Sequence, residues 1–366
     1  MRERIKKKVG IITIYDERNI GNRLQNYAVQ QIVEKLKFQC KSIIYLKNCN
    51  KNLRKEIIKN KLKPVVAFFL YMLNIKKEKC RRVLNFYRFN KKIKNFKKKI
   101  TKESECANLN KYFDFFVTGS DQVWNPLLYP NMYINMLGFT ENSKKIAIAP
   151  SISVDSLSVG QEKMFKELLK DFDNLSCREE QGAELLRKIT GKKVISLIDP
   201  TLMISCDEWD RVSKKPKFHE ESKKYILLYF LGELTEKYKN IINDLSKMYN
   251  LEIINILDKK SKYYSCGPSE FIYMIKNCSI MLTDSFHGSV FSYIYNKPFR
   301  IFYREGGCGY MNSRLTNLME KLHLDESTYL KENDKLENIM EVNYNKEYLK
   351  AEQQKFENYV NSVLIK

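Results

Sequence analysis

The chain has 366 residues and carries 65 Lys and Arg against 43 Asp and Glu, which leaves a formal net charge of +22. Hydrophobic residues make up 43% and aromatic residues 12% of it, which excludes a disordered protein, and its length excludes a small disulfide-stapled one. The nine cysteines include no Cys-x-x-Cys pair, so the sequence does not indicate a zinc or redox site. Their odd number and scattered positions favour a reducing compartment. The positive charge indicates an anionic partner.

The N-terminal residues and the longest apolar run bear on the compartment. The first ten residues are basic and lead into a strand-like block, without the apolar core and cleavage site of a signal peptide. The longest apolar run, residues 65–73, is far shorter than the roughly 20 residues of a membrane-spanning helix. We therefore expect a cytoplasmic protein without a transmembrane segment.

The first half of the chain alternates between strand-like and helical patterns. Residues 9–15 are apolar and β-branched, a polar loop follows, and apolar residues then recur at helical spacing up to Leu36. The next strand candidate, residues 42–46, completes a β-α-β unit, which implies a parallel sheet. Further strands are expected at 113–118, 145–149 and 194–198. We predict a doubly wound N-terminal α/β domain over residues 1–208.

Residues 51–104 interrupt this domain and differ from the rest in composition. They hold 19 Lys and Arg against 3 Glu, so +16 of the net charge of +22 lies here. A solvated helical insertion is the simplest interpretation. The second is contact with an anionic membrane on its inner face, because lysines flank the apolar run 65–73. Nucleic-acid binding is disfavoured, since no recognised binding motif accompanies the charge.

A charged linker, residues 209–224, precedes a second α/β domain over 225–345. Its strands are expected at 225–230, 251–256, 279–283 and 299–302. Residues 346–366 are expected to form a final helix that packs back on the N-terminal domain. The predicted fold is therefore α/β, with two Rossmann-like doubly wound domains that face each other across a cleft and bind ligands at the carboxyl ends of their strands.

The segment 280–296 carries the first candidate site. An apolar strand ends there in the polar pair Asp284 and Ser285, and a helical pattern follows. His287 and Gly288 therefore fall in the first turn of a helix, where free backbone N–H groups and the helix dipole favour an anion. A glycine lets a phosphate approach the backbone, and a histidine there can bind a phosphate oxygen or move a proton. The alternative is that His287 only caps the helix.

A second candidate site lies at the end of another predicted strand. Gly119 leads there into the polar side chains of Ser120, Asp121 and Gln122, and Trp124 follows shortly after. Polar groups beside an aromatic ring suit a sugar or a nucleotide. The alternative is a turn that Asp121 caps, with Trp124 in the core.

The loop after the first strand and one arginine complete the candidates. The loop supplies Asn19, Gly21, Asn22 and Gln25 but lacks the G-x-G-x-x-G spacing of dinucleotide binding. Arg178 follows a short strand, and its guanidinium suits a carboxylate or a phosphate. The alternative for this arginine is a surface ion pair with the adjacent glutamates. With only three histidines in the chain, a multi-histidine metal site is not expected.

Taken in order, these segments resemble the polysaccharide pyruvyl transferase family. The resemblance rests on Asn19-x-Gly-Asn-x-Leu-Gln-x-Tyr-Ala28, Gly119-Ser-Asp-Gln-Val-Trp-Asn125, Cys177-Arg-Glu179, Asp199-Pro-Thr-Leu202, Thr283-Asp-Ser-Phe-His-Gly288 and Asn296-Lys-Pro-Phe299. It implies a two-domain arrangement like that of GT-B glycosyltransferases, with phosphoenolpyruvate as the donor and no further cofactor or metal. The acceptor would be a pair of sugar hydroxyls on a cell-surface polysaccharide, such as a capsule or exopolysaccharide, or on its lipid-linked precursor. The product would be a pyruvate ketal.

Carried over position by position, the family's functional histidine falls on His287 and its donor-binding arginine on Arg178. The resemblance therefore implies that both are catalytic. Residues 149–153 depart from the family pattern, since they lack the expected Ser-aromatic-Gly ending. The other candidates are expected to bind donor or acceptor: Asn19, Gly21, Asn22, Gln25, Ser120, Asp121, Gln122, Trp124, Asp284, Ser285 and Gly288.

Two other functions stay open at this point. A glycosyltransferase that uses a nucleotide sugar would fit the same architecture, because a helix start holds a diphosphate equally well. A non-enzymatic protein that binds RNA or a membrane is favoured only by the net charge.

Overall fold

The computed structural model describes most of the chain. The described residues are 7–46, 53–129, 131–141, 144–304, 312–330, 336, 339–342 and 344–365, with the backbone alone for 53–61. The chain divides into two compact units. Unit 1 comprises residues 1–54, 91–204 and 349–366, and unit 2 comprises 55–90 and 205–348.

Unit 1 is built on parallel strands. A four-stranded sheet has the order β2-β1-β3-β4, and β5 pairs with β6. The strands are β1 (Lys8–Ile12), β2 (Gln39–Ser42), β3 (Phe115–Thr118), β4 (Lys145–Ala147), β5 (Leu175–Cys177) and β6 (Val194–Ser196). Val9, Ile11, Phe116 and Val117 on the central strands are fully buried, as expected where helices cover a parallel sheet on both faces.

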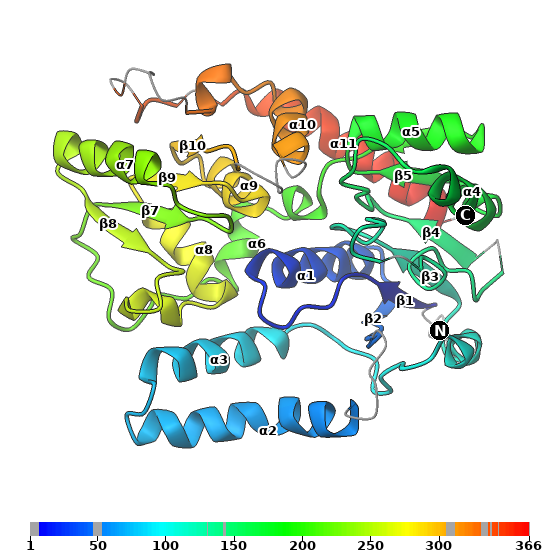
Figure 1. The fold of residues 1–366 in the computed structure, drawn as a ribbon. Coiled ribbons are helices and arrows are strands. Elements are labelled where there is room, and N and C mark those ends of the chain that lie inside the picture. Colours follow the sequence, from blue (N-terminus) through cyan, green and yellow to red (C-terminus); the bar gives the residue numbers. More distant parts are fainter. Residues whose placement is uncertain are drawn as a thin grey trace, which may run out of the picture. The chain divides into compact units, whose positions relative to one another are not determined.

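The helices of unit 1 connect these strands or follow them (Figure 1). They are α1 (Ile20–Lys35), α4 (Val159–Leu169), α5 (Glu180–Thr190) and most of α11 (Lys346–Leu364), with the 3₁₀ helices η1 (Glu103–Lys111) and η3 (Pro200–Met203). A capping box formed by Ser158 and Gln161 starts α4. On α11, the hydroxyl of Tyr359 donates to the carbonyl of Ala147 at 2.8 Å, which joins the end of the chain to β4.

Unit 2 repeats the same architecture. Its four parallel strands have the order β10-β9-β7-β8. They are β7 (Tyr225–Tyr229), β8 (Glu252–Asn255), β9 (Ile280–Thr283) and β10 (Phe299–Ile301). The accompanying helices are α6 (Cys206–Asp210), α7 (Glu236–Tyr249), α8 (Pro268–Asn277), α9 (Phe286–Ile294) and α10 (Asn312–Leu322), with the 3₁₀ helices η4 (Lys262–Ser265) and η6 (Glu326–Thr328).

The strand orders confirm the predicted α/β class with two Rossmann-like, doubly wound parts. In each unit the chain winds first to one side of the sheet and then to the other. The reversal lies between β1 and β3 in unit 1 and between β7 and β9 in unit 2. Loops diverge at the carboxyl ends of such strands and leave room for a ligand. That the two units face each other across a cleft stays a prediction.

The structure divides the basic insertion differently from the predicted domains. Residues 55–90 belong to unit 2, while 91–104 belong to unit 1; the prediction assigned all of 51–104 to the N-terminal domain. The predicted linker 209–224 also lies inside unit 2. The second helix of the insertion makes hydrogen bonds to residues of unit 2 that are far away in the sequence. The spacing of neighbouring residues could not reveal these contacts, so the prediction placed the insertion in the other domain.

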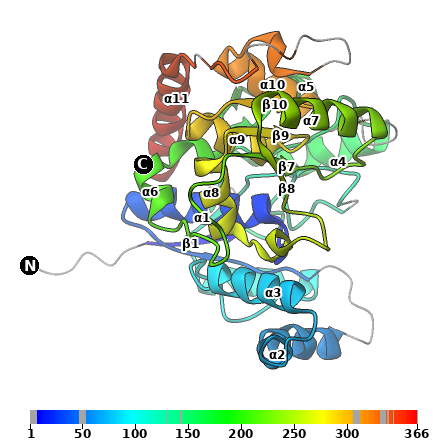
Figure 2. The ribbon, with the colours of Figure 1, turned by 90° about the vertical axis from the view of Figure 1, so that its left-hand side faces the viewer.

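The two helices of the insertion, α2 (Leu53–Met72) and α3 (Lys77–Asn90), lie side by side in both ribbon views (Figures 1 and 2). Ala67 of α2 packs in a small apolar cluster with Cys80 and Leu84 of α3. On α3, Arg82 Nη1 donates to the carbonyls of residues 264 and 266 at 3.0 and 2.7 Å, and Asn85 Nδ2 donates to that of 265 at 2.9 Å. Side chains of α3 therefore provide hydrogen-bond donors for three consecutive backbone carbonyls just before α8.

None of the helices in the described residues is both long enough and apolar enough to cross a lipid bilayer.

Candidate functional site

Unit 1 gathers most of the predicted loop residues at the carboxyl end of β1. Asn22 organises this loop: its Nδ2 donates to the carbonyl of Ile14 at 2.9 Å, and its Oδ1 accepts from the backbone N–H of Asp16 at 3.0 Å. Gln25 Nε2 donates to Thr13 Oγ1 at 2.7 Å. Both amide side chains are buried, so they shape the loop rather than reach toward solvent.

Asn19 and Gly21 lie at the start of α1. Asn19 is exposed and caps the helix, since its Oδ1 accepts from the backbone N–H of Asn22 at 3.0 Å. Gly21 is buried in the first turn. An asparagine before a helix commonly makes this contact, so its local role is explained without a ligand.

Arg178 follows β5 and lies among buried carboxylates. Its Nη1 donates to Asp199 Oδ2 at 2.9 Å, and its Nε and Nη2 both donate to Glu179 Oε1 at 3.1 Å. Asp121 Oδ1 lies 4.0 Å from Nη1. The side chains of Arg178, Glu179 and Asp199 are almost inaccessible to solvent. The alternative of a surface ion pair is therefore wrong, because these pairs are buried.

The charges in this cluster do not cancel. One guanidinium faces the carboxylates of Glu179, Asp199 and Asp121, which is a formal charge of −2. Burial by itself lowers the pKa of Arg178, but these carboxylates outweigh burial and raise that pKa above its ordinary value. Such surroundings disfavour a further anion. Donor binding by Arg178, which the resemblance implies, would therefore require it to give up a carboxylate partner.

Two serines connect the cluster to the ends of β3 and β4. Ser120 is buried, its Oγ donates to the carbonyl of Ala149 at 2.8 Å, and the same oxygen lies 3.4 Å from Asp199 Oδ2. The hydroxyl of Ser151 donates to Glu179 Oε1. Residues from the carboxyl ends of four strands, β3 to β6, thus meet around one arginine.

Gly119 and Asp121 set the path of the backbone between these strands. Gly119 has a φ of +125°, and a Cβ there would lie 2.0 Å from the carbonyl oxygen of Ile148, so only glycine fits. Asp121 has a φ of 59°, a left-handed conformation that aspartate adopts more readily than most residues. Its Oδ2 lies 3.5 Å from Asn22 Nδ2, so Asp121 stands between the loop after β1 and Arg178.

Trp124 lies in the core, which is the alternative considered for it, and not at a binding surface. The indole is completely buried, its Nε1 donates to the carbonyl of Asn135 at 3.1 Å, and the ring packs edge-on against Phe172. Burial of so large a ring is strongly favourable, and the hydrogen bond satisfies its one polar group. A sugar could stack on Trp124 only if the ring left the core. Gln122, close by, is also buried.

Arg23 is a charged residue at this site that the sequence analysis did not single out. It is 1% exposed, its Nη2 donates to the carbonyl of Ile14 at 3.3 Å, and its guanidinium lies 4.8 Å from the ring centre of Tyr15. Its Nε is buried and has no hydrogen-bond partner in the described part of the chain. Burial lowers the pKa of Arg23, against the opposing effects of Tyr15, Asp16 and nearby carboxylates. The sequence could have indicated Arg23, because it lies in the first turn of a helix that follows a strand.

Unit 2 places Asp284 at its own reversal of strand order, at the end of β9. Its Oδ1 and Oδ2 accept from the backbone N–H groups of Leu231 and Gly232, each at 2.7 Å. Oδ2 also accepts from Arg304 Nε at 2.9 Å. Asp284 therefore joins the segments that follow β7, β9 and β10, and its carboxylate already has these donors.

The next residues form the predicted helix start. Ser285 is the N-cap of α9, and its Oγ accepts from the backbone N–H of Gly288 at 3.4 Å. His287 is the second residue of the helix; it is 6% exposed, and its ring lies edge-on to Phe286 with 5.3 Å between centres. Gly288 lets the helix approach β9, because a Cβ there would lie 2.6 Å from Thr283 Oγ1.

The predicted site residues thus form two groups, one in each unit, at the carboxyl ends of parallel strands. The two residues predicted to be catalytic, Arg178 and His287, belong to different units. Their joint action stays a prediction. Among the residues that the structure describes, no three His, Cys, Asp or Glu side chains are arranged to hold a metal ion.

Comparisons with known proteins identify a family. The model of the family described as polysaccharide pyruvyl transferase matches residues 19–306, more than three quarters of the chain. No curated protein sequence matches significantly.

Several solved structures match the whole chain weakly. A protein described as a UDP-N-acetylglucosamine 2-epimerase from Listeria monocytogenes is 13% identical, with a TM-score of 0.49 and coverage of 98% of this chain and 90% of that one. The UDP-GlcNAc 2-epimerase from Methanocaldococcus jannaschii is 14% identical, with a TM-score of 0.47 and coverage of 95% and 92%. The glycotransferase of kitacinnamycin is 8% identical, with a TM-score of 0.45 and coverage of 98% and 99%.

Proposed function

We propose a reaction on the premise that this chain belongs to the polysaccharide pyruvyl transferase family and is a transferase that modifies a polysaccharide. The donor is phosphoenolpyruvate, and the acceptor is a pair of hydroxyls on one sugar of a cell-surface polysaccharide or its lipid-linked precursor. The products are a pyruvate ketal and inorganic phosphate.

The observation that carries the donor assignment is the start of α9. A buried histidine lies in the first turn of this helix, at the carboxyl end of β9 and beside the reversal of strand order. The partial positive charge of a helix N-terminus favours a phosphate there. We assign to His287 the role of phosphate ligand or proton donor to that group, since imidazole changes its protonation near neutral pH.

The acceptor suits the cluster around Arg178 in unit 1. Arg178, Glu179, Asp199 and Asp121 carry a formal charge of −2, or −1 with Arg23, which also interacts with Asp121, and this charge disfavours the anionic donor. Carboxylate and amide groups bind sugar hydroxyls well. Asp121 is the member of this cluster with access to solvent, since its side chain is 13% exposed against 0% for Asp199 and 6% for Glu179. We propose that Asp121 accepts a proton from an attacking hydroxyl, and that Arg178 positions Asp121.

The proposed reaction balances without a cofactor. A proton added to the methylene carbon of phosphoenolpyruvate makes the neighbouring carbon electrophilic, and the first sugar hydroxyl attacks it. The bond between this carbon and the bridging phosphate oxygen then breaks, and the second sugar hydroxyl attacks the same carbon to close the ketal. Of the two hydroxyl protons, one balances the proton gained by the new methyl group and the other leaves with phosphate.

A donor competition tests this proposal. Purified protein is incubated with ¹³C-labelled phosphoenolpyruvate and a sugar acceptor extracted from the cell envelope, and phosphate release and ketal carbon signals are recorded. We expect phosphate release that depends on the acceptor and a new ketal signal. Turnover of a nucleotide sugar without turnover of phosphoenolpyruvate would instead establish the glycosyltransferase alternative.

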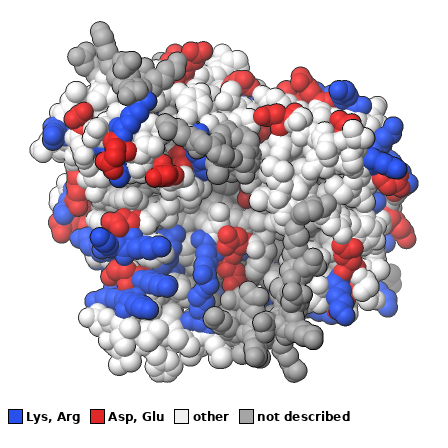
Figure 3. Space-filling model, in the orientation of Figure 1, with Lys and Arg blue, Asp and Glu red and all other residues white. Residues whose placement is uncertain are grey.

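We also propose that α2 rests on an anionic membrane surface, which would bring the enzyme to a lipid-linked acceptor. Large apolar side chains on and just after the helix are half or more exposed, among them Phe69, Met72 and Leu73. α3 beside them is basic, and Figure 3 shows Lys and Arg side chains next to the uncharged surface of α2. Apolar side chains with flanking cations are typical of segments that lie in a membrane interface.

A single substitution tests the membrane contact. Met72→Asp should weaken binding to phosphatidylglycerol vesicles at least about tenfold, because it removes the burial of a Met side chain, worth roughly 1.5–3 kcal/mol, and adds a negative charge. Met248→Asp on α7 is the matched control, since Met248 is also exposed and lies in the same unit. Equal sedimentation of the two variants with vesicles would contradict the contact.

A further inference from the structure

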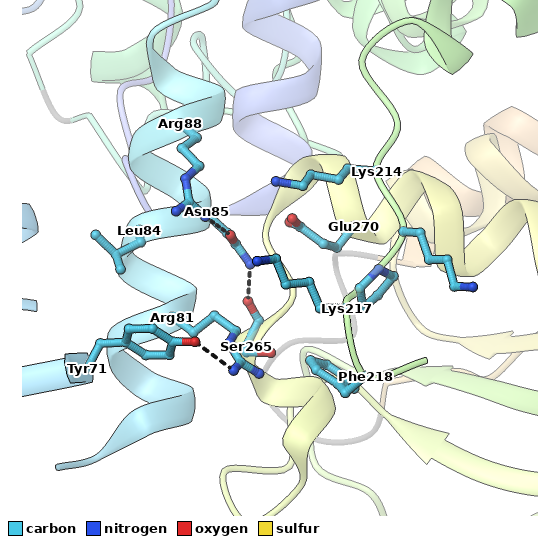
Figure 4. Close-up of a pocket in the computed structure, with 12 residues that line it drawn as sticks. Tyr71, Arg81, Leu84, Asn85, Arg88, Lys214, Lys217, Phe218, Ser265 and Glu270 are labelled. Carbon is cyan, nitrogen blue, oxygen red and sulfur yellow. Dashed lines mark hydrogen bonds between the residues drawn. The ribbon is translucent and has the colours of Figure 1, made fainter. Parts of the chain in front are cut away.

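Unit 2 contains a pocket that neither the sequence motifs nor the proposed reaction uses. It lies between α3, residues 214–218 and the start of α8, and has a volume of about 100 Å³ (Figure 4). Asn85 forms part of its wall and is held by its hydrogen bond to the carbonyl of Ser265. Pockets for drug-sized ligands measure roughly 300–1,000 Å³, so this one fits a small group.

The lining of the pocket is strongly basic. Six of its residues carry charge: Arg81, Arg88, Lys214, Lys215, Lys217 and Glu270. Five cations against one carboxylate give a formal charge of +4. Figure 3 shows blue side chains over and beside α3 on this face.

Two of the five cations have anionic partners. Lys215 pairs with Glu221 at 2.8 Å, and Arg81 pairs with Glu78 at 3.4 Å. For the side chains that the structure describes, Lys214, Lys217 and Arg88 have no acidic group within 4 Å. Three cations without an ion pair in the described side chains thus line a small space: Lys214 and Lys217 are exposed, and Arg88 Nη1 donates to Asn85 Oδ1 at 3.0 Å. Clustered positive charge of this kind attracts an anion.

Glu270 does not cancel this charge. Its Oε2 accepts from the backbone N–H of Gly267 at 3.0 Å and so caps α8. Burial raises the pKa of its carboxyl above the ordinary value, and the nearby charges of Lys214 and Arg88 only partly oppose this shift. The hydrogen bond from Gly267 and the raised pKa both weaken the repulsion between Glu270 and a bound anion, compared with an exposed carboxylate.

We propose that this pocket binds a pyrophosphate group, and that the group belongs to the lipid-linked acceptor. The number of cations without an ion pair fits a group with several negative charges, and the volume fits a phosphate or pyrophosphate without a nucleoside. Tyr71 on α2 lines the pocket, and the exposed apolar side chains of α2 begin in the adjoining turns of that helix. The lipid part of this assignment rests on the proposed function; the anion site does not.

Calorimetry with sodium pyrophosphate on the full chain tests the anion site. Lys214→Gln combined with Lys217→Gln should weaken binding at least about tenfold, because two charges near the anion are lost. Lys259→Gln combined with Lys260→Gln removes the same charge from an exposed turn of unit 2 and should leave the affinity unchanged. Glu270→Gln should tighten binding, since it removes a negative charge and keeps an oxygen for Gly267. Equal affinity of the two double variants would overturn the site.

A second measurement identifies the source of the pyrophosphate. Phosphatidylcholine vesicles with a few per cent of polyprenyl pyrophosphate should bind the wild type more strongly than the Lys214→Gln, Lys217→Gln variant. If both bind these vesicles equally while free pyrophosphate still distinguishes them, the lipid assignment is overturned and the site serves a free phosphate compound. Neither measurement involves phosphoenolpyruvate, so a failed donor assay would leave both results intact.

Discussion

Arg178→Ala is expected to lower the free energy of unfolding by about 3–5 kcal/mol, the range for removal of one partner from a buried ion pair. Glu179 and Asp199 would lose donors at 2.9–3.1 Å, and their carboxylates would remain buried near Asp121 with no guanidinium among them. The measurement is urea unfolding followed by circular dichroism. The family resemblance alone would suggest a variant that is inactive but folded.

Arg187→Ala is the matched control for this substitution. Arg187 lies on α5 and pairs with Glu180 at 2.8 Å, and its Nε and Nη2 donate to the carbonyl of Val194 at 3.0 and 2.8 Å, but both charged side chains are about 40% exposed. Exposed pairs contribute roughly 0–1 kcal/mol and a hydrogen bond roughly 0.5–1.5 kcal/mol, so this variant should lose clearly less stability than Arg178→Ala. If the two alanine variants unfolded at the same urea concentration, the buried cluster would not have the structural role that we assign to Arg178.

His287→Ala is expected to reduce turnover of phosphoenolpyruvate by about 10²–10⁴-fold, the usual contribution of a general acid or base. The imidazole lies in the first turn of α9, and the N-cap of that helix is Ser285, whose Oγ accepts from the backbone N–H of Gly288. The helix should therefore persist while a group that binds or protonates the leaving phosphate is lost. The measurement is the rate of phosphate release at saturating donor and acceptor.

His323→Ala serves as the control for a histidine in the same unit. His323 is exposed and stacks on Tyr348 with 3.8 Å between ring centres, outside the segments that form the candidate site. Its removal should leave turnover within about twofold of the wild type. Wild-type rates in the His287 variant, with thermal unfolding unchanged, would remove His287 from the mechanism.

The alternation of strands and helices could be predicted from the sequence because it depends on local patterns. The expected strands at 225–230, 279–283 and 299–302 correspond to β7, β9 and β10 within one or two residues. The expected strand at 145–149 ends early, at Ala147, because Ala149 has a φ of 46° and leaves the extended conformation. The strand expected at 42–46 is instead β2, an edge strand at 39–42 that pairs within the sheet only with β1.

The candidate positions were found for a related reason. The carboxyl ends of parallel strands share one edge of the sheet, whatever the order of the strands, and ligands bind at that edge. Asp121, Arg178 and His287 could therefore be placed at this edge from the sequence. Their contacts could not. The partners of Arg178 come from residues 121, 179 and 199, and only folding determines which carboxylates reach one guanidinium.

The sequence by itself determined the fold class, the parallel strands and the loops that carry the family motifs, since each follows from the spacing of residues close together in the chain. The tertiary structure decided three other features: the core position of Trp124, the burial of Arg23 and Arg178, and the union of residues 55–90 with unit 2. Each of these depends on contacts between residues far apart in the chain. Such contacts form only when burial and hydrogen bonding outweigh the entropy of bringing distant segments together.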